Sequence, residues 1–182
     1  MQLTHADAGI SQSALEEALL SNMQHGRMST PDIRLVPKTD DETARWLPVA
    51  MAAYEQARRD AGDTPEQAEA ARRLSQEQFF PDGRLVDGHF LFTVVADGDD
   101  VGWLWIGPVD GGSGWYVWDV EVHEAHRGHG LGRATMQLAE DFARSQGATS
   151  MRLNVFAYNA PAVRLYESLG YDTAAMHMHK VL

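Results

Sequence analysis

The sequence predicts one mixed α/β domain in which a mostly antiparallel sheet is flanked by helices. A chain of 182 residues with 44% hydrophobic residues is long enough to bury one continuous core. The hydrophobic spacing changes from a helical to a strand period near residue 88, and a glycine-rich loop over residues 127–133 then precedes further helical patterns. Residues 1–30 are polar and read as an N-terminal extension, so the predicted domain covers residues 31–182.

Helical patterns fill most of the domain before residue 88. A short strand is expected over residues 33–36, followed by a helix that Asp40 or Asp41 can cap. Thr64, with Gln67 three residues later, has the residue types of a capping box and predicts the start of a second helix.

Strands dominate the next part of the chain. Segments rich in Val, Trp, Tyr and Phe, separated by Gly and Asp, indicate an antiparallel meander over residues 90–96, 101–106 and 115–122. The remaining elements are expected to be a helix over 133–146, a strand over 150–156, a helix over 160–169 and a last strand over about 171–181.

The charge and cysteine content exclude several classes of function. Lys and Arg number 15 and Asp and Glu number 26, which gives a net charge of −11 and argues against nucleic-acid and membrane partners. The chain has no cysteine, so disulfides and thiolate nucleophiles are excluded. Without a signal-like N-terminus or a long apolar run, a cytoplasmic protein is expected.

The segment RGHGLGR, from Arg127 to Arg133, is typical of an anion-binding loop. Glycine lets the backbone approach a ligand, and the N-terminus of the following helix offers free N–H groups. A dinucleotide fingerprint starting at Gly128 would need glycine at Arg133, and a P-loop would need Gly-Lys-Ser or Gly-Lys-Thr. Neither pattern is present, which leaves a phosphate or pyrophosphate site or a tight turn without a ligand.

A second motif follows 27 residues after Gly132. Together, Arg127-x-x-Gly130-x-Gly132 and Asn159-x-x-Ala162-x-x-Leu165-Tyr166-x-x-x-Gly170-Tyr171 closely resemble the two signature motifs of the GNAT superfamily of acyl-coenzyme A dependent N-acyltransferases. The resemblance covers residues 88–182. It implies splayed central strands that hold acetyl-CoA as the co-substrate, and transfer of the acetyl group to a primary amine of a small molecule or peptide.

The resemblance also implies roles for individual residues. Backbone groups of Val120, Glu121 and Val122 would meet the pantetheine arm, and Asn159 would contact the pantetheine or phosphate region. Tyr166, also a contact of the coenzyme, would protonate the leaving thiolate. The pyrophosphate would be bound by Arg127, Gly128, His129, Gly130, Leu131, Gly132 and Arg133.

The base is left open between several groups. An amine must lose a proton to attack a thioester, so a base or a water chain is required. Glu121 is the first candidate, Asp119 is the second, and His123 or water is a further alternative. Strand alternation places the side chains of Asp119, Glu121 and His123 on one face of the sheet. It places those of Trp118, Val120 and Val122 on the opposite face.

Some of these residues also fit purely structural roles. Tyr166 lies on the apolar stripe of its helix, so it also fits a core aromatic, and the tryptophans of the meander fit either the sheet core or an acceptor pocket. The histidines lack zinc-site spacing, so no metal is expected.

A coenzyme A sensor without turnover and a nicotinamide oxidoreductase are rival functions. The acidic charge favours a cationic acceptor, and a homodimer is compatible with the sequence.

Overall fold

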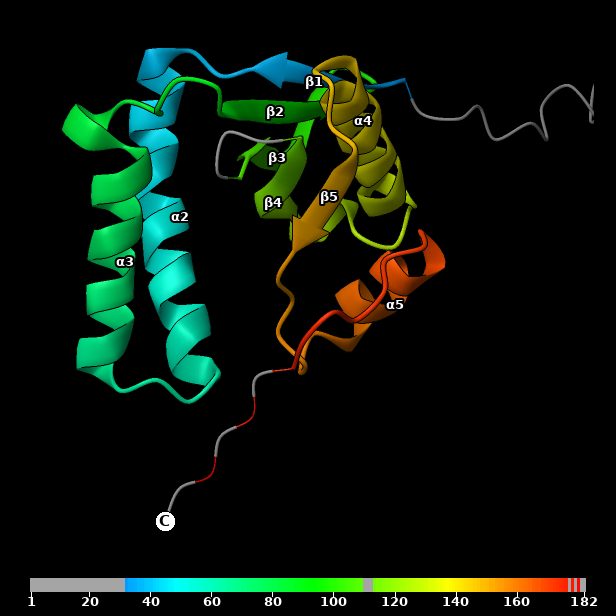
Figure 1. Cartoon of the computed structure of the whole chain (residues 1–182). Helices are drawn as coiled ribbons and strands as arrows, with labels where there is room; N and C mark the ends of the chain where they lie inside the picture. Colours follow the sequence, from blue (N-terminus) through cyan, green and yellow to red (C-terminus); the bar gives the residue numbers. More distant parts are fainter. Residues whose placement is uncertain (1–31, 110–112, 177, 179, 181–182) are drawn as a thin grey trace, which may run out of the picture. The chain divides into compact units, whose positions relative to one another are not determined.

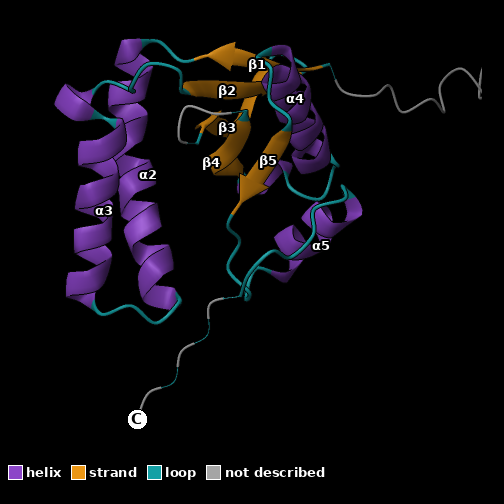
Figure 2. Cartoon of the chain, in the orientation of Figure 1, coloured by secondary structure: helices purple, strands orange, loops and turns teal. Residues whose placement is uncertain are grey.

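A β-sheet with helices on both faces forms the centre of the computed structural model (Figures 1 and 2). The structure describes residues 32–109, 113–176, 178 and 180. These all belong to the second of two units into which the chain divides, Asp32–Leu182. The prediction for residues 1–30 lies outside the described residues.

The sheet has the mixed, mostly antiparallel topology that the sequence predicts. Its five described strands lie side by side in chain order, and each of the first four runs antiparallel to its neighbours in that series. The last strand is parallel to the fourth. The strands are β1 (Ile33–Pro37), β2 (Phe90–Ala96), β3 (Asp99–Pro108), β4 (Gly114–Val122) and β5 (Ser150–Leu153).

Two helices, α2 (Asp40–Asp60) and α3 (Pro65–Phe79), form a hairpin against one face of the sheet. The cap of α2 is Thr39, which forms a capping box with Glu42. The predicted caps Asp40 and Asp41 instead occupy the first helical turn, where negative charge also favours the helix. The hydroxyl of Thr39 is better placed because its residue keeps the extended backbone that an N-cap requires.

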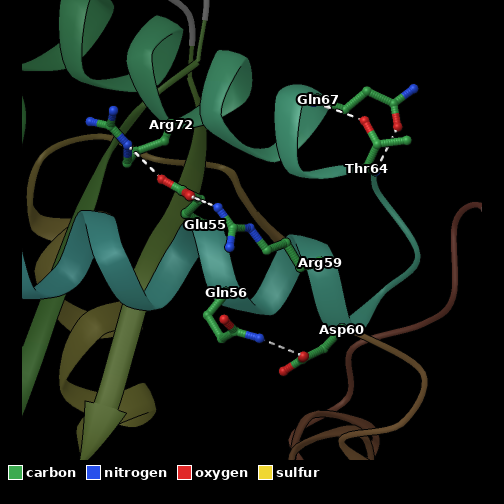
Figure 3. Close-up of polar contacts among 7 residues, drawn as sticks. All are labelled: Glu55, Gln56, Arg59, Asp60, Thr64, Gln67 and Arg72. Atoms are coloured by element: carbon green, nitrogen blue, oxygen red, sulfur yellow. Dashed lines mark hydrogen bonds and ion pairs between the residues drawn. The ribbon is translucent and has the colours of Figure 1, made fainter.

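Polar contacts hold the two helices of the hairpin together (Figure 3). Glu55 of α2 accepts a hydrogen bond from Arg59 on its own helix and another, 2.8 Å long, from the Nε of Arg72 on α3. The predicted capping box at the start of α3 is confirmed, because Thr64 and Gln67 bond each other's backbone N–H groups.

Two apolar clusters fix the helices to opposite faces of the sheet. On one face, α2 and α3 pack on Leu91 and Trp105 through Trp46, Leu47, Ala50, Met51, Phe79 and Phe80. On the other face lies α4 (Leu131–Ser145), which covers the buried side chains Val94, Leu104, Ile106 and Val117 with Met136, Ala139 and Ala143. The residues of α5 (Ala160–Ser168) add Tyr166 to the rim of this second cluster.

The C-terminal segment differs from the prediction. The last strand expected over about 171–181 is not formed by residues 171–176, 178 and 180, and the strand expected over 150–156 ends at Leu153. Met176 and Met178 are largely exposed, so these apolar side chains are not covered as they would be in a strand packed on the core. Among the helices that the structure describes, none is long and apolar enough to cross a membrane.

Candidate active site

A β-bulge in β4 determines which side chains face the helical hairpin. Trp105 of β3 lies opposite Asp119, and the next residue of β3, Ile106, lies opposite Val117. Trp118 is therefore an extra residue in β4, which locally breaks the alternation of faces. The simple alternation predicted Trp118 on the face of Val120 and Val122, and this was wrong. Trp118 packs against the cluster under α2 and α3, with its ring 4.3 Å from that of Phe79.

Strands β4 and β5 pair over only part of their length. Their parallel register runs from Gly114 opposite Ser150 to Val117 opposite Leu153. Beyond that point no described strand lies beside residues 118–122 on this edge of β4. Main-chain N–H and C=O groups at such an edge need other partners, so this part of β4 can bind an extended ligand through its backbone.

The N-terminus of α4 is suited to bind an anion. Gly130 is the N-cap, with a φ of +80° that favours glycine, and no described side chain caps this helix end. The first helical bond runs from the N–H of Ala134 to the carbonyl of Gly130, so the preceding N–H groups point out of the helix. A Cβ added to Gly130 would meet no described atom within 4 Å. The glycine loop therefore leaves open space in front of free donors and the positive helix end.

The side chains of the two arginines of the loop are hydrogen-bonded to other parts of the chain. Arg127 donates from Nε to the carbonyl of Val122 at 2.8 Å and from Nη2 to Glu121 at 2.8 Å. Arg133 donates to the hydroxyl and carbonyl of Ser168 and so ties α4 to α5. In this structure the anion-binding capacity of the loop therefore comes mainly from its backbone.

The start of α5 is held by Asn159. Its side-chain oxygen accepts a hydrogen bond from the N–H of Ala162 at 3.3 Å, which confirms the predicted N-cap. The helix packs closely on α4, since a Cβ at Gly132 would lie 3.3 Å from Leu165. Glycine at position 132 thus allows the approach that brings Tyr166 next to the sheet.

Asp119 is a partly buried carboxylate. Its Oδ2 accepts a hydrogen bond from the indole Nε1 of Trp103 at 2.7 Å. Burial raises the pKa of Asp119 from 3.8 to about 6, the bond from Trp103 opposes that rise, and the nearby charge of Glu121 adds to it. Asp119 therefore titrates close to neutrality, as a group that exchanges protons in a reaction should.

Tyr166 lies within electrostatic range of Asp119. Burial raises the pKa of the Tyr166 phenol, and the negative charge of Asp119 raises it further. The Tyr166 ring contacts the Tyr171 ring edge-on at 5.9 Å and lies at the rim of the core under α4. Tyr166 can therefore be both a packed core residue and a proton donor, because its ring is packed while its hydroxyl stays protonated at neutral pH.

The other candidates for the base have different partners. Glu121 forms its ion pair with Arg127, and both side chains are substantially exposed. The Nε2 of His123 lies 3.2 Å from an oxygen of Asp100. Sequence reasoning treated Trp103 as core or pocket lining and missed its bond to Asp119. The only available signal was their place on neighbouring strands, and the register of those strands cannot be known in advance.

The comparisons with known proteins agree with this arrangement. Residues 49–171 match the model of the Acetyltransferase (GNAT) family. The chain belongs to the GNAT family. This membership confirms the predicted resemblance and identifies an acetyltransferase.

Several bacterial GNAT proteins are similar to the chain. The N-acetyltransferase YdgE of Bacillus subtilis (strain 168) is 32% identical over 122 residues, which cover 65% of this chain and 78% of YdgE. The crystal structure of YycN from Bacillus subtilis has 29% identity and a TM-score of 0.75, covering 82% of this chain and 98% of that one. Streptothricin acetyltransferase of Streptomyces lavendulae is 37% identical over 90 residues, 50% of this chain and 48% of that protein.

The environment of Asp119 predicts a pH-dependent cost to stability. A carboxyl whose pKa is higher in the folded than in the unfolded state destabilises the fold above its folded pKa, and the penalty disappears below the unfolded pKa. Asp119→Asn, which keeps an acceptor for Trp103, is therefore expected to raise the free energy of unfolding at pH 8 by up to about 3 kcal/mol.

Urea unfolding between pH 8 and pH 4 measures this gain, which should shrink as the pH falls from 6 towards 4. Asp172→Asn is the matched control at an exposed position and should show no comparable gain. A gain for Asp119→Asn that does not vary with pH would contradict the buried, charged carboxylate.

Proposed function

We propose that the protein transfers the acetyl group of acetyl-CoA directly to a primary amine of a small molecule or peptide. In this proposal Asp119 accepts the proton of the attacking amine, and Tyr166 donates a proton to the departing sulfur. The observation that supports it is that Asp119, just beyond the point where β5 separates from β4, lies near enough for its charge to raise the pKa of Tyr166.

The coenzyme fits the elements around that point. The uncapped first turn of α4 and the backbone of residues 127–133 would bind the pyrophosphate, as anions bind to free N–H groups at a helix start. The unpaired edge of β4 would bond the pantetheine arm through the backbone of Val120, Glu121 and Val122. The amide nitrogen of Asn159, whose oxygen caps α5, is the contact expected from the second motif.

Asp119 is a better base than Glu121 in this geometry. A base must be ionised at the working pH and still basic enough to take a proton, which favours a pKa near neutrality. Asp119, with a pKa of about 6, meets both conditions at pH 7. Glu121 forms an ion pair with Arg127 at the surface, where it helps to hold the end of β4.

Tyr166 has the properties required of the acid. A proton donor to a thiolate must itself be protonated before the reaction, and a raised pKa ensures that Tyr166 is. A positioned acid or base contributes roughly 10²- to 10⁴-fold in rate. The charge of Asp119 adds to that rise, so the phenol lies within electrostatic range of the proposed base.

The proposed reaction balances with these two groups. The acceptor nitrogen reacts as the neutral amine, its ammonium form having first released a proton to solvent, and forms a bond to the acetyl carbon while the carbon–sulfur bond breaks. Asp119 takes one proton from nitrogen, and Tyr166 gives its proton to sulfur. Transfer of a proton from Asp119 to the Tyr166 phenolate then restores both groups, so the products are the acetylated amine and the free thiol of coenzyme A.

Charge supports a cationic acceptor. The net charge of −11 attracts cations, and Asp119 lies among indole rings, whose faces also attract cations. Streptothricin acetyltransferase, by its name, acts on streptothricin, and this similarity supports an acceptor other than a protein for this chain. Thiol release from acetyl-CoA across a panel of polyamines, aminoglycosides, amino acids and peptides tests this, and the absence of cysteine removes any protein thiol signal.

Replacing Tyr166 tests the acid. Tyr166→Phe keeps the packed ring and is expected to lower kcat at least about tenfold, with the affinity for coenzyme A nearly unchanged. The matched control is Tyr171→Phe, which removes the neighbouring buried hydroxyl and should leave kcat within about twofold. Equal kcat values for the Tyr166 variant and the native protein would remove this residue from the acid role.

Filling the glycine loop tests the pyrophosphate site. Gly130→Trp is expected to weaken coenzyme A binding by more than about tenfold in calorimetry, since its side chain would stand in front of the free N–H groups. Gly147→Trp is the control at the other end of α4, where the φ is also positive and a Cβ also meets no described atom within 4 Å. Native affinity in the Gly130 variant, or an equal loss in both, would contradict this site.

A further inference from the structure

The carboxylate of Asp119 is held by a neighbouring indole. At 2.7 Å, the bond from Nε1 of Trp103 to Oδ2 of Asp119 is at the short end of the range for N–H to oxygen bonds, as expected for an ionised acceptor. An indole N–H can only donate, so it stabilises the carboxylate without competing for the proton that the carboxylate receives. The bond also fixes one oxygen of a side chain that would otherwise rotate freely.

Strand register explains how Trp103 reaches this carboxylate. Trp103 of β3 lies opposite Glu121, and Trp105 lies opposite Asp119. The two carboxylates and the two indoles therefore share the face under α2. The indole of Trp103 spans the diagonal between these cross-strand pairs to bond Asp119, a distance that long aromatic side chains can cover.

Trp103 contacts two other aromatic rings. Its ring meets the ring of His123 edge-on at 5.5 Å, and His123 is bonded to Asp100. The ring of Trp46 from α2 lies 6.4 Å away, also edge-on. These contacts with the end of β4 and with α2 restrict the rotamers of the indole.

We propose that Trp103 is a positioning residue for acetyl transfer, which holds Asp119 in the orientation that accepts the amine proton and is itself held by His123 and Trp46. This inference rests on the proposed function of Asp119. The titratable and charged groups that face the network are Glu121 with its partner Arg127, His123 with Asp100, His89 beside Trp105 and Trp118, and Tyr166 from α5.

The sign of the expected pH effect follows from the hydrogen bond. Because the bond from Trp103 lowers the pKa of Asp119, its loss should raise that pKa above about 6. Trp103→Phe, which keeps an aromatic ring but no N–H, should therefore move the rising limb of kcat/KM to higher pH. It should also lower kcat roughly tenfold with little change in the KM of the amine, because the lost contact acts on the base.

The matched control is Trp118→Phe. The indole N–H of Trp118 is buried in the same aromatic cluster and has no hydrogen-bond partner among the described residues. Removing it changes an indole to a phenyl ring without breaking a bond to Asp119. The pH profile of this variant should keep the native midpoint, and an identical shift in both variants would reduce the role of Trp103 to packing.

A spectroscopic measurement separates this inference from the proposed function. In ¹⁵N-labelled protein, the indole N–H resonance that disappears in Trp103→Phe should titrate with a midpoint near pH 6, and the titration should be lost in Asp119→Asn. Because His123 is titratable and contacts the same ring, the midpoint should persist in His123→Gln.

The outcomes are distinguishable. If the indole titrates with Asp119 but no amine is acetylated, the proposed function fails and the Trp103–Asp119 coupling stands. If turnover depends on Asp119 while Trp103→Phe keeps the native kcat and pH profile, the positioning role is overturned and the proposed function stands.

Discussion

The extra residue in β4 is the constraint on which the proposed site depends. With Trp118 inserted opposite β3, the indole at 118 and the carboxylate at 119 both face the layer of α2 and α3. If the same sequence paired without a bulge, Trp118 would lie opposite Trp105. Every later residue of β4 would then face the other side of the sheet, because side chains alternate with a period of two. Asp119 would then point into the apolar cluster under α4, away from Trp103. The bulge thus places a titratable group at the edge where β5 leaves the sheet.

The two faces of the sheet differ in the side chains that they bury. The face under α4 is tightly buried and combines aliphatic side chains with the rings of Phe92 and Trp115, and Leu104 and Ile106 are fully excluded from solvent there. The face under α2 and α3 is rich in indole and phenyl rings and carries the polar network of Trp103 and Asp119. The network of the proposed base thus lies on one side of the sheet, and the start of α4 and the ring of Tyr166 lie on the other.

Sequence reasoning reached the fold but not the detailed geometry around Asp119. The meander, the glycine loop and the caps at Thr64 and Asn159 follow from local spacing and residue type, so they were predictable. The bulge at Trp118 and the bond from Trp103 depend on strand register, which is set by packing of the whole sheet. The last strand predicted over about 171–181 is not formed by residues 171–176, 178 and 180, because pairing needs a neighbouring strand that local sequence does not reveal.

The roles of Asp119 and Tyr166 require that the reacting end of the coenzyme lies between them. A crystal structure of the protein with coenzyme A tests this most directly. We expect the pyrophosphate on the N–H groups at the start of α4, the pantetheine arm along residues 120–122, and the thiol next to the Tyr166 hydroxyl and the Asp119 carboxylate. A coenzyme bound away from α4, or a thiol remote from both side chains, would contradict it.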